Sequence, residues 1–432
     1  MFRYLLQQLQ LQILTGGLAN YSYKVTCTDD STSPLFAKLT FTYALVFPDK
    51  KCPLERTQFE YDALMMYHNV LSNSPRSSDT AVTPYFCINV GDDKKLLVTE
   101  FSPLDEQAAN QFIDGVVDLR VASKLAHSAA ALHGVKDVDP NFNSGMKPFC
   151  QDLVSLAEEI FFDGFMKKEV DMDRPTSLAQ SFGKEMLDQT IIKYRKKLED
   201  TDCMIHGDCH VFNMLVGAKP SIETLENFSE SGDVVIIDWE FSRVGPIGID
   251  VGYMIPFPIA ACLTHALNGE LSSSESILKF LDTVWDEYLA TVSTEREFSD
   301  VYNSALSFCG IILLVYYNMG YHMEFLPLDD ADIEGLTRVK ESLGVLGLKF
   351  LSWGFGRSDG EVDLTLPELR KMFNVTVTEE IQRLSPIKAV RGRNRRSSML
   401  RASGRRVSDA HYFLSNSGKK MGALMEAEAL MM

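Results

Sequence analysis

A short polar loop, followed by a strand that ends in two acids, has the residue types and spacing that phosphoryl transfer requires. The loop reads H-G-D-C-H-V-F-N at residues 206–213, and an apolar strand at 234–237 then runs into D-W-E at 238–240. Such a reaction needs one carboxylate to orient a hydroxyl nucleophile, and oxygen ligands to hold Mg²⁺ on the nucleotide phosphates. We therefore expect Asp208 to be the catalytic base. We expect Asn213 and Asp238, with Glu240 as a further ligand, to hold the metal.

Two short strands should position this loop. An apolar pair at 204–205 leads into Asp208, and a second apolar run at 214–216 leaves from Asn213. A turn-rich insert at 219–232 then separates these strands from the one that ends at Asp238. The polar loop and the acids that end the strand stand about 25 to 30 residues apart, as in kinase-type catalytic loops. Both halves of the pattern in this order favour a phosphotransferase site over a merely satisfied buried turn.

A nucleotide-covering hairpin is expected near the N-terminus. The segment around Gly16 and Gly17 reads as strand, turn and strand, and the second strand starts after Asn20. Backbone N–H groups of such a turn can approach phosphates. The next strand, 35–40, carries Lys38 in an apolar setting, where a charged group needs a partner. We expect that partner to be Glu60, on a helix at about 54–70, in a pair that aligns the phosphates.

The segment after the strand at 96–101 predicts a hinge between two lobes. This strand runs into Ser102 and Pro103, and a proline stops a strand sharply. We expect backbone groups from Glu100 to Ser102 to bind the adenine edge.

From residue 106 onward, the apolar periodicity is helical. Helices are predicted at 116–133, 178–198, 273–292, 297–317 and 330–350, with a buried helical segment at 251–266 that contains an internal Pro-Phe-Pro. The fold class is therefore α+β, with a small antiparallel-sheet N-lobe and a large α-rich C-lobe. The expected divisions are an N-lobe at 1–102, a C-lobe at 103–356, a C-terminal extension at 357–386 and a basic Ser/Arg-rich tail at 387–432.

These motifs resemble the aminoglycoside phosphotransferase and choline kinase superfamily, small-molecule kinases with a protein-kinase-like, two-lobed fold. Within it, D-W-E at 238–240 followed by G-P-I-G-I-D-V-G at 245–252 is similar to methylthioribose kinases. The resemblance implies ATP and Mg²⁺ as cofactors. It also implies 5-methylthioribose, an intermediate of methionine salvage, as the substrate phosphorylated on a hydroxyl.

The resemblance is weaker for the substrate than for the phosphoryl-transfer residues. Methylthioribose kinases usually carry a serine where this chain has Asn213, and an arginine pair late in the helical lobe, for which Arg338 is the nearest match here. We expect Arg338 and Arg243 to contact the substrate. Asp250 should either support the metal loop or face the substrate.

Two other functions stay open at this point. An amino alcohol such as choline or ethanolamine would need an aromatic and acidic pocket, for which residues such as Tyr316 and Trp353 are available. A non-catalytic nucleotide-binding module would be expected to lack one of the key residues, and none is missing.

Composition restricts the partners. The net charge is −17, yet residues 387–420 hold ten Lys or Arg and one Asp, a net charge of +9. Since the last twelve residues add two Glu, −24 remains for residues 1–386, and so acidic a body is a poor nucleic-acid binder.

No run of 18 apolar residues predicts a membrane span. Eight cysteines without C-x-x-C spacing suit a reducing cytoplasm.

The basic tail has the composition of a segment that does not fold alone. Within it, Ser398 and Ser408 follow Arg-Arg pairs and are candidate phosphorylation sites. A homodimer is compatible with the sequence.

Overall fold

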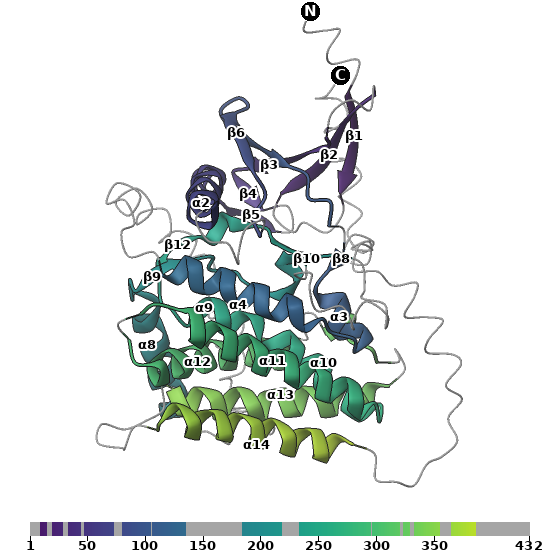
Figure 1. Ribbon diagram of the computed structural model, residues 1–432, viewed down its shortest axis with the longest axis vertical. Helices are drawn as coiled ribbons and strands as arrows, with labels where there is room; N and C mark the ends of the chain where they lie inside the picture. The colour runs from purple at the N-terminus through teal and green to yellow at the C-terminus, as the bar shows by residue number, and fades with distance from the viewer. Residues whose placement is uncertain are drawn as a thin grey trace, which may run out of the picture.

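A computed structural model shows two structurally distinct regions, and in Figure 1 a sheet with one helix beside it lies at one end and most of the helices lie at the other. It describes residues 9–14, 20–28, 33–44, 47–72, 80–104, 106–134, 184–217, 233–294, 296–319, 323–328, 332–354 and 364–385. The α+β fold class with an antiparallel sheet and a helical C-terminal region is confirmed.

The sheet has five strands in the order β1-β2-β3-β7-β6, and every neighbouring pair is antiparallel. Their bounds are β1 Leu9–Leu14, β2 Tyr21–Cys27, β3 Leu35–Phe41, β6 Pro84–Asn89 and β7 Lys94–Glu100. A two-stranded ribbon, β4 Tyr43–Ala44 with β5 Phe47–Lys51, follows β3. In β3, Ala37 and Lys38 point to opposite faces of the sheet, because side chains alternate along a strand.

Helix α2, Glu55–Ser72, packs on the face of the sheet that carries Lys38. It covers β6 and β7, and its buried side chains include Ala63, Leu64 and Tyr67. Tyr67 also packs against Trp239, with 4.4 Å between ring centroids. The helix therefore contacts both the sheet and the segment around Trp239, and it fixes one relative to the other.

The helical lobe is built in layers beneath the sheet (Figure 1). Its helices are α3 Ala109–Asp114, α4 Leu119–His133, α8 Lys184–Leu198, α9 Ile249–Met254, α10 Pro256–Leu267, α11 Leu271–Thr291, α12 Phe298–Met319, α13 Ile333–Gly354 and α14 Leu366–Leu384. Each predicted helix has a counterpart, and the buried segment at 251–266 is divided between α9 and α10. The division falls at Pro256, since a proline lacks the amide that would continue the first helix.

Helix α14 lies within the predicted C-terminal extension and packs against α10, α12 and α13. Its start is fixed by a capping box, in which Thr365 donates from its backbone and hydroxyl to Glu368 Oε2, at 2.8 Å each. Its buried face, including Leu369, Phe373 and Val377, joins the core of the lobe. The helical lobe thus reaches Leu384.

Two apolar segments of the described chain, Ile249–Leu267 and Phe298–Tyr317, are long enough to cross a membrane by length and composition, with mean hydropathies of 1.2 and 1.5. They are 94% and 72% buried inside the protein. Their apolar character therefore follows from their place in the core.

Small strands connect the helical lobe to the site. The hairpin β10 Met214–Val216 with β11 Val234–Ile236 is extended by β8 Glu106–Gln107, and β9 Cys203–Ile205 pairs with β12 Arg243–Gly245. Short 3-10 turns follow two of these strands, at η2 Val211–Asn213 and η4 Trp239–Phe241. All three strands that border the polar loops, β9, β10 and β11, are almost wholly buried, so the loops are carried on rigid supports.

Candidate active site

The loop between β9 and β10 holds Asp208 in a defined orientation. Asn213 donates from its side-chain amide to the backbone carbonyl of Asp208 at 3.0 Å and to its Oδ2 at 3.1 Å. The backbone of Asn213 is itself fixed. Its backbone N–H donates to the carbonyl of His210, and its backbone carbonyl accepts from Ile237 N, both at 2.9 Å. The side chain of Asp208 nevertheless stays 29% exposed. A carboxylate anchored from one side and open on the other can accept a proton from a bound molecule.

The turn at Gly207 allows this geometry. Gly207 has φ of +84°, and a Cβ there would lie 2.4 Å from the carbonyl oxygen of Phe241. The close approach brings the loop against the chain that follows Asp238, and only glycine permits it.

Asp250, on α9, supports the same loop from below. Its Oδ2 accepts from the amide of His206 and its Oδ1 from the amide of Gly207, both at 2.8 Å. His133 Nε2 lies 3.1 Å from Oδ2, and His133 Nδ1 is bonded to Tyr288 Oη at 2.7 Å. Burial alone would raise the pKa of Asp250, but His133 and the His206 amide lower it below its usual value. The carboxylate is ionised and its two oxygens are engaged by the loop.

His206 links two loops. We call residues 206–213, which include Asp208, the catalytic loop, and Asp238–Phe241 the metal loop. The Nδ1 of His206 accepts from the Asp208 amide at 3.2 Å, and its Nε2 lies 3.1 Å from the carbonyl of Ile237. This arrangement fixes the tautomer with the proton on Nε2. Burial lowers the pKa of His206, although nearby carboxylates oppose this effect. A neutral imidazole therefore acts as a spacer between the two loops.

His210 sets the charge environment of Asp208. Its Nε2 lies 3.5 Å from Asp208 Oδ2. Burial alone would raise the pKa of Asp208, but the charge and hydrogen bonding of His210, with His206 and Asn213, bring it below its usual value. Burial would conversely lower the pKa of His210, yet Asp208 raises it. Asp208 is thus held in its ionised form.

Asp238 begins the metal loop with an unusual backbone. It is the sole non-glycine residue of the described chain with positive φ, at φ 66° and ψ 61°. Such a conformation costs on the order of 1–3 kcal/mol. Trp239 offsets this, because its buried ring packs on His206 and Tyr67 while its Nε1 donates to Ile236 O at 2.9 Å. Burying a large apolar side chain contributes about 1.5–3 kcal/mol, enough to hold the strained residue.

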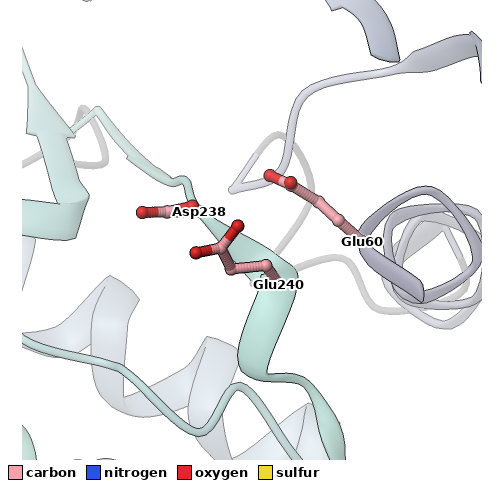
Figure 2. A group of neighbouring side chains, drawn as sticks. All are labelled: Glu60, Asp238 and Glu240. Atoms are coloured by element: carbon pink, nitrogen blue, oxygen red, sulfur yellow. The ribbon is translucent and has the colours of Figure 1, made fainter. Parts of the chain in front are cut away.

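Three carboxylates converge on the ammonium of Lys38 (Figure 2 shows the carboxylates). Lys38 Nζ lies 2.7 Å from Glu60, 2.5 Å from Asp238 and 3.4 Å from Glu240. Burial opposes the charged form of Lys38, but the carboxylates outweigh it and raise its pKa well above the usual value. Burial raises the pKa of Glu60 to about 7, although Lys38 counters this. Asp238 is the accessible member, with a side chain 38% exposed against 5% for Glu60 and 6% for Glu240.

This cluster has donors that suit a hard divalent cation. Ligand atoms of Glu60, Asp238 and Glu240 all lie within 4.8 Å of one another, and carboxylate oxygens are the ligands that Mg²⁺ prefers. The amide nitrogen of Asn213 is turned to Asp208, which leaves its amide oxygen for a cation. The residues therefore fit a magnesium ion on the Asp238 and Asn213 side of the site.

The other predicted nucleotide-binding residues have mixed outcomes. Gly16 and Gly17 lie outside the described residues. Asn20 is buried and bonds Arg56 and Glu240. The amide of Glu100 donates to Thr83 O at 2.8 Å, and that of Phe101 to Pro34 O at 3.3 Å, so neither is left for adenine. The hydroxyl of Ser102 accepts from Leu104 N at 3.1 Å, which shapes the hinge. Adenine binding at this hinge stays a prediction.

The structure gives Arg338 partners at the end of a helix. Arg338, on α13, donates from Nη2 to the carbonyls of Arg383 and Leu384 at 3.2 and 3.3 Å, so it caps the C-terminus of α14. These contacts argue against a substrate role for Arg338, and its contact with the substrate stays a prediction. Of the two roles open for Asp250, its 1% exposure and its bonds to the loop favour support.

Arg243 stays a candidate for substrate contact. It lies on β12, paired in register with Ile205, and is only 8% exposed. Its Nε is buried without a hydrogen-bond partner. Burial raises the pKa of the Tyr253 hydroxyl to about 12. The charge of Asp208 also raises this pKa and the charge of Arg243 lowers it, so both charged groups act on the same hydroxyl.

The sequence assigned no role to three residues of the site. Arg56 and His133 look like ordinary members of their helices, and His210 like a loop residue. Their partners lie 36 residues away for Arg56 with Asn20, and 117 for His133 with Asp250. The repeated H at 206 and 210 is the one feature that pointed to His210.

Comparisons with known proteins agree with this geometry. Residues 11–267, more than half of the chain, match the model of the phosphotransferase enzyme family. The methylthioribose kinase of Bacillus cereus (strain AH820) is 22% identical over 291 residues, which cover 64% of this chain and 65% of that protein. The methylthioribose kinase of Geobacillus sp. (strain WCH70) is 29% identical over 99 residues, which cover 23% of this chain and 20% of that protein. The chain thus spans somewhat less than two thirds of the length of the first of these relatives.

Among solved structures, an aminoglycoside phosphotransferase from Alicyclobacillus acidocaldarius is 13% identical, with a TM-score of 0.41. The superposition covers 86% of this chain and 96% of that one.

Proposed function

This chain belongs to the phosphotransferase enzyme family, and from this premise we propose that it transfers the terminal phosphoryl group of ATP to a hydroxyl of a small metabolite. The observation that carries the proposal is Asp208, which is anchored by Asn213, ionised beside His210 and still accessible. A non-catalytic nucleotide-binding module has no need of such a carboxylate.

Asp208 orients the acceptor hydroxyl and takes its proton as the new bond to phosphorus forms. Lys38, held by Glu60, would contact the α- and β-phosphates of a bound nucleotide. Asp238 and Asn213 would hold Mg²⁺, which when bound neutralises phosphate charge. Most of the rate enhancement comes from this positioning and charge stabilisation, because phosphoryl transfer asks little covalent chemistry of the protein.

The first candidate substrate is 5-methylthioribose, on the strength of the methylthioribose kinase relatives and the D-W-E and G-P-I-G-I-D-V-G segments. Arg243 supports a sugar over a quaternary amine, because a guanidinium donates to hydroxyls and repels a cation. The residues once considered for an amino-alcohol pocket give it little support. Tyr316 is 3% exposed, and Trp353 packs on Phe350 at 5.3 Å within α13.

The test is a coupled ATPase screen of the purified protein with methylthioribose, choline, ethanolamine and an aminoglycoside, with Asp208→Asn as the inactive control. Turnover of methylthioribose that Asp208→Asn abolishes is the expected result. Robust choline turnover, with none on methylthioribose, would replace the substrate, and no acceptor-dependent turnover would refute the enzyme.

Magnesium dependence, a homodimer, a cytoplasmic location and phosphorylation of Ser398 and Ser408 stay predictions, and both serines lie outside the described residues. The seven cysteines of the described chain form no disulfide with one another.

A further inference from the structure

A buried arginine connects three segments of the site that are far apart in sequence. Arg56, on α2, is 1% exposed. It donates to Pro53 O at 3.2 Å and to Asn20 Oδ1 at 2.9 Å, and its Nε lies 3.5 Å from Glu240 Oε2. A buried guanidinium is kept only where its donors find partners, and these come from the residue before β2, from the segment before α2 and from the metal loop.

Asn20 completes the link between the hairpin and the metal loop. While its Oδ1 accepts from Arg56, its Nδ2 donates to Glu240 Oε2 at 3.1 Å. Asn20 directly precedes β2, in the hairpin expected to cover the nucleotide, and stands 220 residues before Glu240. Because acceptor and donor are both used, the amide has one orientation.

One oxygen of Glu240 is engaged by all of these donors. This oxygen, Oε2, receives Asn20 and lies within 3.5 Å of both Lys38 Nζ and Arg56 Nε. Its side chain is 6% exposed, against 38% for Asp238. Mg²⁺ requires ligand oxygens at about 2.0–2.1 Å and keeps several waters, which favours the accessible carboxylate. Figure 2 shows both side chains arising from the same loop.

We propose that Glu240 is a positioning residue: through Asn20 and Arg56 it ties the nucleotide-covering hairpin and α2 to the metal loop, and it is not itself a metal ligand. The proposal rests on the ATP and magnesium use of the proposed function and departs from the metal-ligand role expected for Glu240. Five groups share the charge of this interior, three carboxylates and two cations. Without Arg56, three carboxylates would face the single cation of Lys38. This would leave a net formal charge of −2 next to the place where the phosphates would bind.

The experiment separates metal binding from nucleotide binding and uses no acceptor substrate. Mn²⁺ binding is followed by electron paramagnetic resonance in the presence of a non-hydrolysable ATP analogue, and the analogue affinity is measured separately. The variants are Glu240→Gln, Arg56→Met and their double, with Asp238→Asn as the metal-ligand reference. Arg370→Met, which removes a surface ion pair to Asp286 in the helical lobe, is the control.

For Glu240→Gln and Arg56→Met we expect the Mn²⁺ stoichiometry of the parent chain and an analogue affinity lower by about tenfold or more, as the loss of a charge-assisted hydrogen bond predicts. The double variant should lose no more than the worse single one, because both act on one network. In turnover, KM for ATP should rise more than kcat falls. Arg370→Met should match the parent.

If Arg56→Met does not fold, Asn20→Ala takes its place. This change removes one side-chain amide and leaves the charges of Arg56 and Glu240, and the expected result is the same. Loss of manganese in Glu240→Gln equal to that in Asp238→Asn would overturn the proposal, as would additive losses in the double variant. A parent chain that binds no analogue refutes the proposed function instead. The coupling free energy between Arg56 and Glu240 is obtained separately, from denaturant unfolding of the two single variants and the double variant.

Discussion

Replacing Asp250 by asparagine tests whether this carboxylate supports the catalytic loop or faces the substrate. The two side chains have nearly the same shape, so the change removes the charge and one acceptor with little change in packing. In the structure both oxygens of Asp250 accept amides, from His206 and Gly207 at 2.8 Å each. Asparagine keeps one acceptor and turns an N–H group toward the other amide.

The expected loss follows from these contacts. A hydrogen bond to a charged group contributes about 1.5–3 kcal/mol, and a buried donor left unpaired costs about 1–3 kcal/mol. Because the substitution causes one loss of each kind, the helical lobe should lose about 2.5–6 kcal/mol of its free energy of unfolding. Catalysis should fall as well, since a misplacement of about 1 Å in a catalytic group can cost on the order of 10² in rate.

The measurement is urea unfolding followed by tryptophan fluorescence, with kcat and KM for the acceptor determined in parallel. All three tryptophans, Trp239, Trp285 and Trp353, lie in the helical lobe or its metal loop, so the signal reports that region. Asp286→Asn, at a surface carboxylate 62% exposed, is the control and should change stability by no more than about 1 kcal/mol. Unchanged stability of Asp250→Asn with a raised KM for the acceptor would refute the supporting role.

The stability difference should also depend on pH. Because the pKa of Asp250 is lowered in the folded protein, its contribution is present above the unfolded value, about 3.9, and is lost as pH falls through the lower folded value. The gap between the parent and Asp250→Asn should therefore be constant near neutrality and narrow below about pH 4. A gap that stays constant to the lowest pH would contradict the assigned charge.

Four further substitutions test the site. Asp208→Asn should lower turnover by on the order of 10²–10⁴ and leave ATP binding nearly intact, and a loss under about tenfold would remove it as the base. Asp238→Ala should abolish magnesium-dependent nucleotide binding, measured by calorimetry with and without Mg²⁺; unchanged affinity would reject it as a ligand. Arg243→Ala should raise KM for methylthioribose without creating choline kinase activity, and an unchanged KM would place Arg243 outside the pocket. Arg338→Ala should lower stability by about 1 kcal/mol through the lost α14 cap and leave KM unchanged, whereas a raised KM would restore its substrate role.

The sequence by itself determined the fold class and the order of the elements, and it singled out the candidate phosphoryl-transfer residues. Local rules decide these features: strand and helix periods require particular spacings, Gly207 is needed at a tight turn, and Asp208 and Asn213 stand close enough in the chain to bond each other. Lys38 and Glu60 could be paired in advance because a charge on a buried strand needs a partner on the next helix.

Only the tertiary structure decided the roles of residues whose partners are distant in the chain. Arg338 resembled a substrate residue until α14 was seen to end beside it, and Asp250 had two open roles until the amides of His206 and Gly207 were seen on its oxygens. Asn20 and Glu240, 220 residues apart, share a hydrogen bond that no local pattern records. A side chain's type limits what it can bind, but the packing of the lobes selects which of those partners comes within about 3 Å.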